Sequence, residues 1–121
     1  MTDGEPLFVL FVYGSLKRGQ ANEHELAGAC YLGPALTAAV FALREIDGYP
    51  ALVPGQRAIG GELYRLSLQQ LRALDELEGE AYMRREIALA NGEPALAYLA
   101  CEPDAGKPFA FAVWPAPAQR S

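Results

Sequence analysis

The stretch LFVLFVYGSLKRG, residues 7–19, decides how the rest of the chain can fold. Its first six residues are all apolar, which predicts a buried strand that is too short to span a membrane. Glycine and small residues follow at once, so we expect the strand to lead into a tight loop. Backbone N–H groups in such a loop can hold an anion or a developing oxyanion. The sequence therefore favours ligand binding at this loop, and a plain tight turn at Gly14-Ser15 is the alternative.

Composition limits the classes of partner. The chain has 121 residues, of which 51% are hydrophobic, which is enough for one domain with its own core, so residues 1–121 are predicted to form a single domain. A net charge of −5 disfavours nucleic acid and anionic lipid and favours a small-molecule or protein partner. Residues 1–6 hold no basic segment, and no apolar run reaches the roughly 18–20 residues of a membrane span. The sequence therefore predicts a cytoplasmic protein without a membrane partner.

Two cysteines and one histidine bear on metal binding. Cys30 and Cys101 have no neighbouring cysteine or histidine at ligand spacing, so we expect both to be small buried hydrophobic residues. The only histidine is His24. The sequence therefore predicts no metal site.

Short strands dominate the predicted architecture. We expect a small α+β domain with about seven strands, whose sheet is bent or closed into a barrel. We expect a short helix at residues 22–28, followed by two strand pieces within residues 30–43 that meet at a bend at Gly33-Pro34. A turn at residues 47–50 and a short strand at 51–53 come next, and then a strand at 62–66 preceded by a bulge or close crossing at Gly60-Gly61. Residues 82–90 and 95–101 are expected to form a hairpin.

A capping box begins the clearest helix. Ser67 is followed three residues later by Gln70, and Gly79 marks the end of the segment. Leu71 and Leu74 lie at helical spacing and are predicted to face the core.

Glu78 continues the stripe of this helix that Leu74 turns toward the core. An inward carboxylate is costly unless it is paired or functional, because burial raises its pKa and suits it to exchange a proton near neutral pH. Glu78 is therefore a candidate acid–base group. The alternatives are a carboxylate paired with Arg84, Arg85 or a buried tyrosine, or one that swings into water.

Several polar residues lie near these two candidates. Tyr13 and Tyr82 are expected to line a pocket, although tyrosines at strand ends also serve as packing groups. Lys17, Arg18 and His24 either attract an anionic substrate to the loop or form a solvated loop tip.

Two familiar chemistries do not fit the loop. Its glycine spacing is that of a phosphate-binding P-loop, but Gln20-Ala21 stands where Lys and Ser or Thr are needed. Ser15 lacks the Gly-x-Ser-x-Gly setting of a nucleophilic serine. We therefore expect Ser15 to contribute its backbone N–H.

Taken together, these motifs resemble the γ-glutamylcyclotransferase-like family. The resemblance is carried, in the family's order, by VYGSLKRG at 12–19, GYPA at 48–51, GELY at 61–64, and LDELEG at 74–79 followed by Tyr82 and Arg84. It covers most of residues 7–100 and is strongest toward the branch that includes γ-glutamylamine cyclotransferase.

The resemblance implies a fold and a site. The family fold is a small mixed β-barrel flanked by helices. The likeness places the substrate-binding loop on Tyr13, Gly14, Ser15 and Leu16 and the catalytic acid–base group on Glu78.

The implied reaction releases 5-oxoproline and a free amine or amino acid from a γ-glutamyl amide, with neither metal nor cofactor. The substrate's own amino group closes the ring at high effective molarity. Two other functions stay open, namely a non-catalytic domain that binds a carboxylate metabolite, and an interaction protein that uses Phe109, Phe111 and Trp114.

Overall fold

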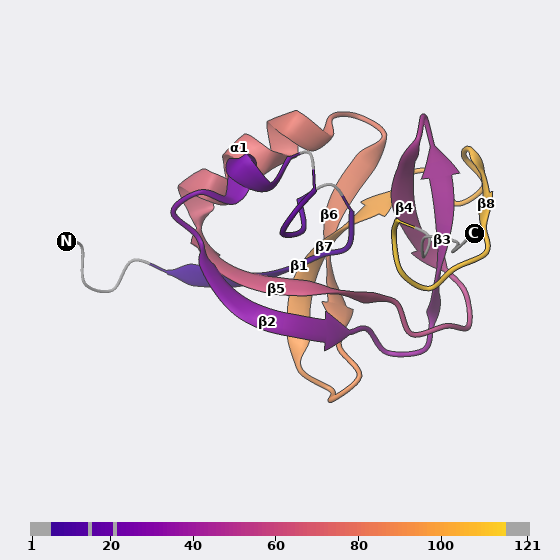
Figure 1. The fold of residues 1–121 in the computed structure, drawn as a ribbon, viewed down its shortest axis with the longest axis horizontal. Helices are drawn as coiled ribbons and strands as arrows, with labels where there is room; N and C mark the ends of the chain where they lie inside the picture. Colours follow the sequence, from indigo (N-terminus) through magenta and orange to yellow (C-terminus); the bar gives the residue numbers. More distant parts are fainter. Residues whose placement is uncertain (1–5, 15, 21, 116–121) are drawn as a thin grey trace, which may run out of the picture.

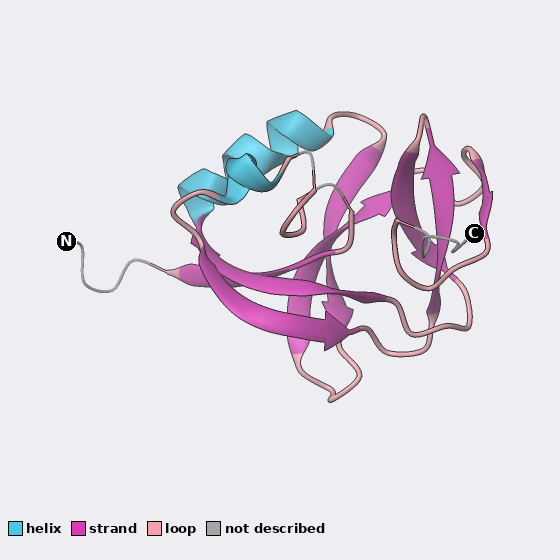
Figure 2. Cartoon of the chain, in the orientation of Figure 1, coloured by secondary structure: helices cyan, strands magenta, loops and turns pink. Residues whose placement is uncertain are grey.

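The structure is a computed structural model that describes residues 6–14, 16–20 and 22–115. Within these residues one sheet of eight strands is accompanied by one α-helix and one short 3-10 helix (Figures 1 and 2). The strands are β1 (Leu7–Val12), β2 (Cys30–Leu36), β3 (Phe41–Ile46), β4 (Tyr49–Pro54), β5 (Gly60–Ser67), β6 (Tyr82–Ala88), β7 (Pro94–Ala100) and β8 (Lys107–Phe109), and the helices are η1 (Glu23–Leu26) and α1 (Leu68–Glu78).

The sheet is mixed and curls into a half-barrel, which confirms the predicted α+β class. Its strand order is β2-β5-β1-β7-β4-β3-β8, with β6 paired to β7. β7 pairs antiparallel with β6 along its whole length and parallel with β1 at Leu96 and with β4 at Leu99. β1 and β4 thus meet β7 at successive points along it, and the β3–β4 hairpin stands at the right of the molecule, apart from α1 at the upper left (Figure 1).

The second half of β1, Leu10 to Val12, is buried on both faces, as its continuous apolar run predicts, whereas Leu7 at its start is exposed. Phe11 packs in a cluster with residues of β3, β4 and β7 on one face. Leu10 and Val12 pack on the other face with α1 and β5. The strand therefore joins the two main parts of the core.

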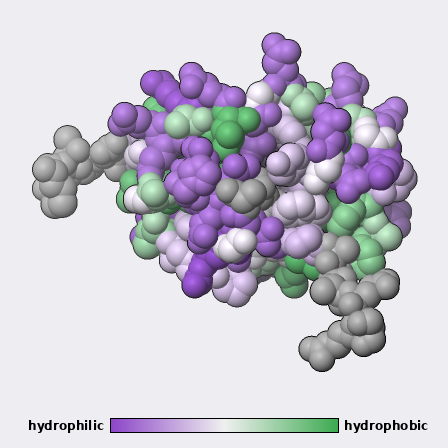
Figure 3. Space-filling view, turned by 45° about the horizontal axis from the view of Figure 1, so that its top comes forward, coloured by the Kyte–Doolittle hydropathy of each residue, from purple (hydrophilic) through white to green (hydrophobic). Residues whose placement is uncertain are grey.

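Helix α1 begins with the predicted capping box. The Gln70 N–H donates to the Ser67 hydroxyl at 3.2 Å, and the Ser67 N–H donates to the Gln70 side chain at 2.8 Å. Leu71 and Leu74 are buried against the sheet, and the helix ends before Gly79, whose φ of 73° suits glycine. The helix covers one side of the sheet, and this face of the molecule is mainly hydrophilic with small separate hydrophobic groups (Figures 2 and 3).

The predicted bend at Gly33-Pro34 is wrong. β2 runs through both residues with a bulge between Tyr31 and Gly33, and the chain leaves the strand only after Leu36. Proline is tolerated because β2 lies at the edge of the sheet, where one side of the strand needs no hydrogen-bond donor.

Three further local predictions can be compared with the structure. The helix expected at residues 22–28 is a 3-10 helix of four residues. The close crossing expected at Gly60-Gly61 is confirmed, because a Cβ on Gly61 would lie 2.3 Å from the backbone oxygen of Val12. The hairpin of β6 and β7 is also confirmed, with Ala88 paired to Pro94.

Both cysteines differ from their expected burial. Cys30 and Cys101 are free and exposed, at the start of edge strand β2 and just after β7. Among the described residues, no helix is long and apolar enough to cross a membrane.

Candidate functional site

A cavity of about 390 Å³ opens between the end of β1, the β3–β4 turn and the end of α1. These three segments come from distant parts of the sequence and lie on one side of the curled sheet (Figure 1). The lining residues are Phe11, Val12, Tyr13, Gly14, Leu16, Asn22, Ile46, Asp47, Tyr49, Pro50, Leu77, Glu78, Ala81, Tyr82 and Tyr98. The cavity therefore brings together the described residues of the predicted loop and the predicted carboxylate.

Tyr13 forms part of the buried wall, with its hydroxyl committed inside the protein. The hydroxyl donates to the backbone carbonyl of Tyr98 and accepts the N–H of Leu52 at 3.0 Å. Burial raises the pKa of Tyr13, so the phenol stays protonated. Tyr13 therefore lines the cavity, and its hydroxyl links β4 to β7 through these two hydrogen bonds.

The loop after β1 passes close to β4. A Cβ on Gly14 would lie 2.9 Å from Cγ of Pro50, so a larger residue would push the loop away. The N–H of Lys17 donates to the carbonyl of Gly14 at 3.0 Å, which closes a tight turn, and Leu16 is buried. Ser15, predicted to bind substrate, lies outside the described residues.

Glu78 is the last residue of α1, half-buried, and lines the cavity. Burial raises the pKa of its carboxyl to about 7. A carboxyl with this pKa is populated in both protonation states near neutral pH, which suits it to take up and return a proton.

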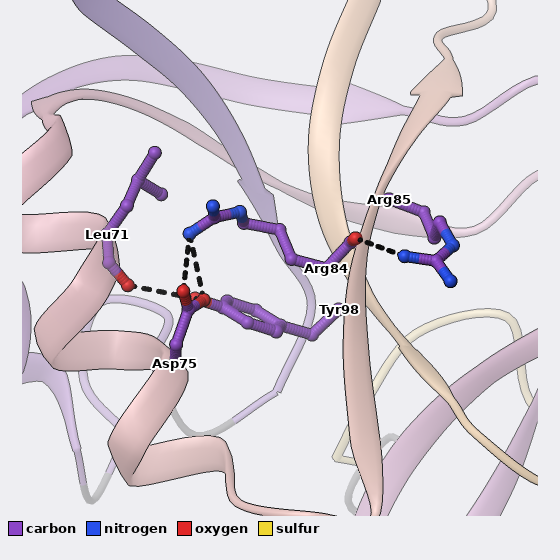
Figure 4. A network of polar contacts seen from close by, with 5 residues as sticks. All are labelled: Leu71, Asp75, Arg84, Arg85 and Tyr98. Atoms are coloured by element: carbon purple, nitrogen blue, oxygen red, sulfur yellow. Dashed lines mark hydrogen bonds and ion pairs between the residues drawn. The ribbon is translucent and has the colours of Figure 1, made fainter.

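Arg84 pairs with a different carboxylate from the one considered in the sequence. Its guanidinium contacts both oxygens of Asp75, at 2.9 and 2.8 Å, while Arg85 donates to the carbonyl of Arg84 (Figure 4). The hydroxyl of Tyr98 donates to Asp75 at 2.7 Å and lies 3.4 Å from the carbonyl of Leu71 (Figure 4). Asp75 thus ties α1 to β6 and β7, one helical turn before Glu78.

Tyr82 lies at the start of β6 and also lines the cavity. Its hydroxyl donates to the carbonyl of Pro50 at 3.0 Å. Burial, together with the nearby carboxylates of Glu78 and Asp47, raises the pKa of Tyr82 to about 12. Tyr82 therefore stays protonated at neutral pH and remains a hydrogen-bond donor.

The three basic residues expected at the loop do not line this cavity. Lys17 lines a second, more open cavity together with Glu62, and burial lowers its pKa. Arg18 lies over the ring of Tyr31, 4.5 Å from its centre. His24 pairs with its neighbour Glu25 at 3.2 Å. The structure therefore does not place these three residues in the wall of this cavity, and whether they attract a substrate or form a solvated loop tip stays open.

The β3–β4 turn was predicted as a turn but not as part of the site. Asp47 and Pro50 read as turn residues, and the structure places both in the cavity wall. The signal available in the sequence was the position of this Asp-Gly turn between two apolar runs, which does not reveal what the turn faces. In the described part of the chain, no three His, Cys, Asp or Glu side chains converge to hold a metal ion.

Comparison with known sequences gives a consistent result. Residues 10–115 match the family described as "Gamma-glutamyl cyclotransferase, AIG2-like". A "Putative gamma-glutamylcyclotransferase" of Vibrio cholerae is 37% identical over 70 residues, which are 58% of this chain and 61% of that protein's length. The Escherichia coli "Gamma-glutamylcyclotransferase family protein YtfP" is 36% identical over 85 residues, covering 69% of this chain and 74% of the relative. "Gamma-glutamylaminecyclotransferase A" of Danio rerio is 33% identical over 109 residues, covering 74% and 66%.

Solved structures share the fold. The protein c4763 of uropathogenic Escherichia coli superposes with a TM-score of 0.70 at 28% identity, covering 78% of this chain and 80% of that one. An AIG2-like protein from Mus musculus superposes with a TM-score of 0.68 at 27% identity, covering 78% of each chain.

Proposed function

The chain belongs to the gamma-glutamyl cyclotransferase, AIG2-like family, and on that premise we propose that it releases 5-oxoproline and a free amine or amino acid from a γ-glutamyl amide. One observation carries the proposal. A half-buried carboxyl, Glu78, whose pKa is raised to about 7, lines a cavity of about 390 Å³ beside the glycine-containing loop. The cavity is of the size that small-molecule sites have.

The substrate supplies its own nucleophile. The α-amino nitrogen attacks the γ-carbonyl carbon, a carbon–nitrogen bond closes a five-membered ring, and the bond from that carbon to the leaving nitrogen breaks. The α-nitrogen loses two protons from its ammonium form and the leaving nitrogen gains two, so no water is consumed. The high effective molarity of a five-membered ring closure supplies much of the rate.

Glu78 moves the protons in this proposal. Its carboxylate takes one proton from the α-ammonium before ring closure, and its carboxylic acid donates that proton to the departing nitrogen. The ring nitrogen loses its second proton after closure, and the released amine takes up one proton as it enters the solvent. Backbone N–H groups of residues 14–16 stabilise the oxygen of the tetrahedral intermediate. Tyr13 and Tyr82, both protonated at neutral pH and both donating to backbone carbonyls, shape the wall of the cavity.

The test is detection of 5-oxoproline by mass spectrometry. Purified protein is incubated with a γ-glutamyl alkylamide, γ-glutamyl amino acids and glutathione, in parallel with Glu78→Gln and with Glu76→Gln. Glu76 is exposed on the same helix, so its variant removes the same charge away from the cavity. We expect product from the wild type and Glu76→Gln and a loss of at least about 100-fold in Glu78→Gln.

Two outcomes would contradict the proposal. Full activity of Glu78→Gln would remove Glu78 from its proposed role. No product from any amide, combined with thermal stabilisation of the protein by 5-oxoproline, would support a carboxylate-binding domain instead of an enzyme.

A further inference from the structure

The loop after β1 contributes to two different cavities. Gly14 and Leu16 line the cavity that holds Glu78, whereas Lys17 lines the second, more open cavity, whose volume is about 730 Å³. The rest of the second cavity is formed by parts of β2 and β5, by the turn between β6 and β7, and by Val113. The proposed reaction takes place in the first cavity, so it gives the second one no role.

The amine of Lys17 lies in this second cavity without a direct partner. Lys17 is half-buried, and within the described part of the chain its Nζ forms no hydrogen bond or ion pair. The carboxylate in the same cavity wall is that of Glu62, which already accepts the backbone N–H of Arg18 at 2.8 Å. The ammonium of Lys17 therefore loses part of its hydration and gains no ion pair in return.

This setting favours the neutral form of the amine. Burial lowers the pKa of Lys17, and the negative charge of Glu62 opposes that shift only in part. At a given pH, a larger fraction of Lys17 is thus neutral than of a fully solvated lysine. The neutral amine is the form of lysine that attacks an electrophilic carbon.

The chain contains one other lysine, Lys107, which serves as an internal reference. Its side chain is 74% exposed, and its Nζ lies 3.0 Å from Oε2 of Glu45. Exposure alone would make Lys107 the lysine that reacts first. Lys107, however, must lose both its proton and its ion pair before it can attack, whereas Lys17 has no ion pair to break.

The walls of the second cavity indicate which kind of electrophile suits Lys17. Leu36, Leu63 and Leu89 line the cavity beside it, so a short hydrocarbon chain attached to Nζ can make apolar contacts there. Transfer of an acyl group turns the ammonium into a neutral amide, which removes the charge that burial penalises. Alkylation of the amine would leave the charge in place.

We propose that Lys17 is an acylation site, to which an activated short-chain acyl group is transferred in preference to Lys107. The acyl group is carried as an acyl phosphate or as a thioester. The lysine nitrogen attacks the acyl carbon, a carbon–nitrogen bond forms, and the bond from that carbon to the phosphate oxygen or the thioester sulfur breaks. The ammonium of Lys17 gives up one proton to solvent before the attack, and a second proton passes through solvent to the departing phosphate or thiolate. The inference is independent of the proposed cyclotransferase reaction.

The experiment compares the two lysines within one molecule. Purified protein is incubated near neutral pH with acetyl phosphate or, in a separate reaction, with acetyl coenzyme A. The rates of acetylation at Lys17 and Lys107 are followed by mass spectrometry of the digested protein. The same reactions are run in guanidinium chloride, with Lys17→Arg, and with Glu62→Gln beside its control Glu76→Gln, which removes an exposed charge on α1. Circular dichroism verifies that each variant is folded.

We expect Lys17 of the folded protein to be acetylated at least about threefold faster than Lys107 by one or both reagents, and the reagent that gives this preference identifies the carrier. The two rates should become equal within about a factor of two in guanidinium chloride, where neither amine has a folded environment. Lys17→Arg should remove the faster reaction and leave the rate at Lys107 unchanged. Glu62→Gln should speed acetylation of Lys17 by about twofold or more, because it removes the negative charge that favours the ammonium, and Glu76→Gln should not.

Three results would overturn the inference. The first is a rate at Lys107 that equals or exceeds the rate at Lys17 with both reagents in the folded protein. The second is a preference for Lys17 that persists in guanidinium chloride, which would assign it to the local sequence rather than to the cavity. The third is a folded Glu62→Gln variant in which Lys17 is acetylated no faster than in the wild type.

Discussion

Arg84 on β6 contacts both carboxylate oxygens of Asp75 on α1, at 2.9 and 2.8 Å (Figure 4). The pair lies one helical turn before Glu78, so it fixes the end of α1 that carries the proposed acid–base group. The two side chains remain 27% and 40% exposed, which moderates the energy of the pair.

Replacement of Arg84 by Met should lower the free energy of unfolding by about 1 kcal/mol, because a partly buried carboxylate loses its charged partner. Arg85→Met is the matched control on the next residue, which is exposed and, among the described residues, donates only to the carbonyl of Arg84. Its effect should stay within about 0.5 kcal/mol. Urea denaturation measures both, and equal losses in the two variants would contradict the assigned role of Arg84.

Gly61→Ala should be strongly destabilising. The new Cβ would lie 2.3 Å from the backbone oxygen of Val12 and 2.6 Å from Cζ of Phe11, so β1 and β5 would have to separate. We expect a loss of about 3 kcal/mol or more, or failure to fold. Gly60→Ala is the control, because its Cβ would have no neighbour closer than 3.7 Å. Similar denaturation midpoints for the two variants would contradict the predicted clash.

Tyr13→Phe should cost more stability than Tyr82→Phe. Loss of the Tyr13 hydroxyl leaves the buried N–H of Leu52 and the carbonyl of Tyr98 without this partner, which should cost about 2 kcal/mol. Loss of the Tyr82 hydroxyl removes one hydrogen bond at a half-buried site, which should lower the free energy of unfolding by about 1 kcal/mol or less. Urea denaturation of the two variants under the same conditions tests the order, and the reverse order would refute it.

Glu78 makes stability depend on pH with a definite sign. Its pKa rises from 4.5 in the unfolded chain to about 7 in the folded protein, so between these values the folded state binds the proton more tightly. Stability therefore falls as pH rises through this window, by on the order of 2 kcal/mol. Glu78→Gln should remove this fall, so its stability relative to the wild type should increase from pH 4.5 to pH 8. A constant difference between the two proteins across this range would show that the pKa of Glu78 is not raised.

The raised pKa of Glu78 also predicts how kcat/KM depends on pH below neutrality. If Glu78 accepts the proton, kcat/KM for a γ-glutamyl amide rises with pH and levels off above about 7. Steady-state rates from pH 5 to pH 8, with substrate ionisation measured separately, locate the limb. A midpoint near the ordinary pKa of a glutamate would contradict this assignment.

The sequence predicted the features that depend on local signals. β1 was recognisable because its apolar run is continuous, and α1 because Ser67, Gln70 and Gly79 mark its ends. The inward position of Glu78 followed from helical spacing alone.

Features that depend on long-range pairing were not predictable. Asp47 reaches the cavity wall because β4 pairs in parallel with β7 at Leu99, and no local pattern specifies that pairing. Arg84 pairs with Asp75 because of where β6 lies against α1, which no local pattern in the sequence specifies. Cys30 was expected to be buried and is exposed, because it lies on β2 at the edge of the sheet rather than inside it.

The double burial of β1 has a consequence for how the chain is made. This strand leaves the ribosome before its partners, since Leu7 pairs with Ser67 and Leu10 with Leu96. Until β5 and β7 have been synthesised, an apolar run with both faces unprotected has no native surface to cover it. Such segments associate with one another, so refolding yield should fall as protein concentration rises. The strand that joins the two main parts of the native core is thus also a segment that needs protection during synthesis.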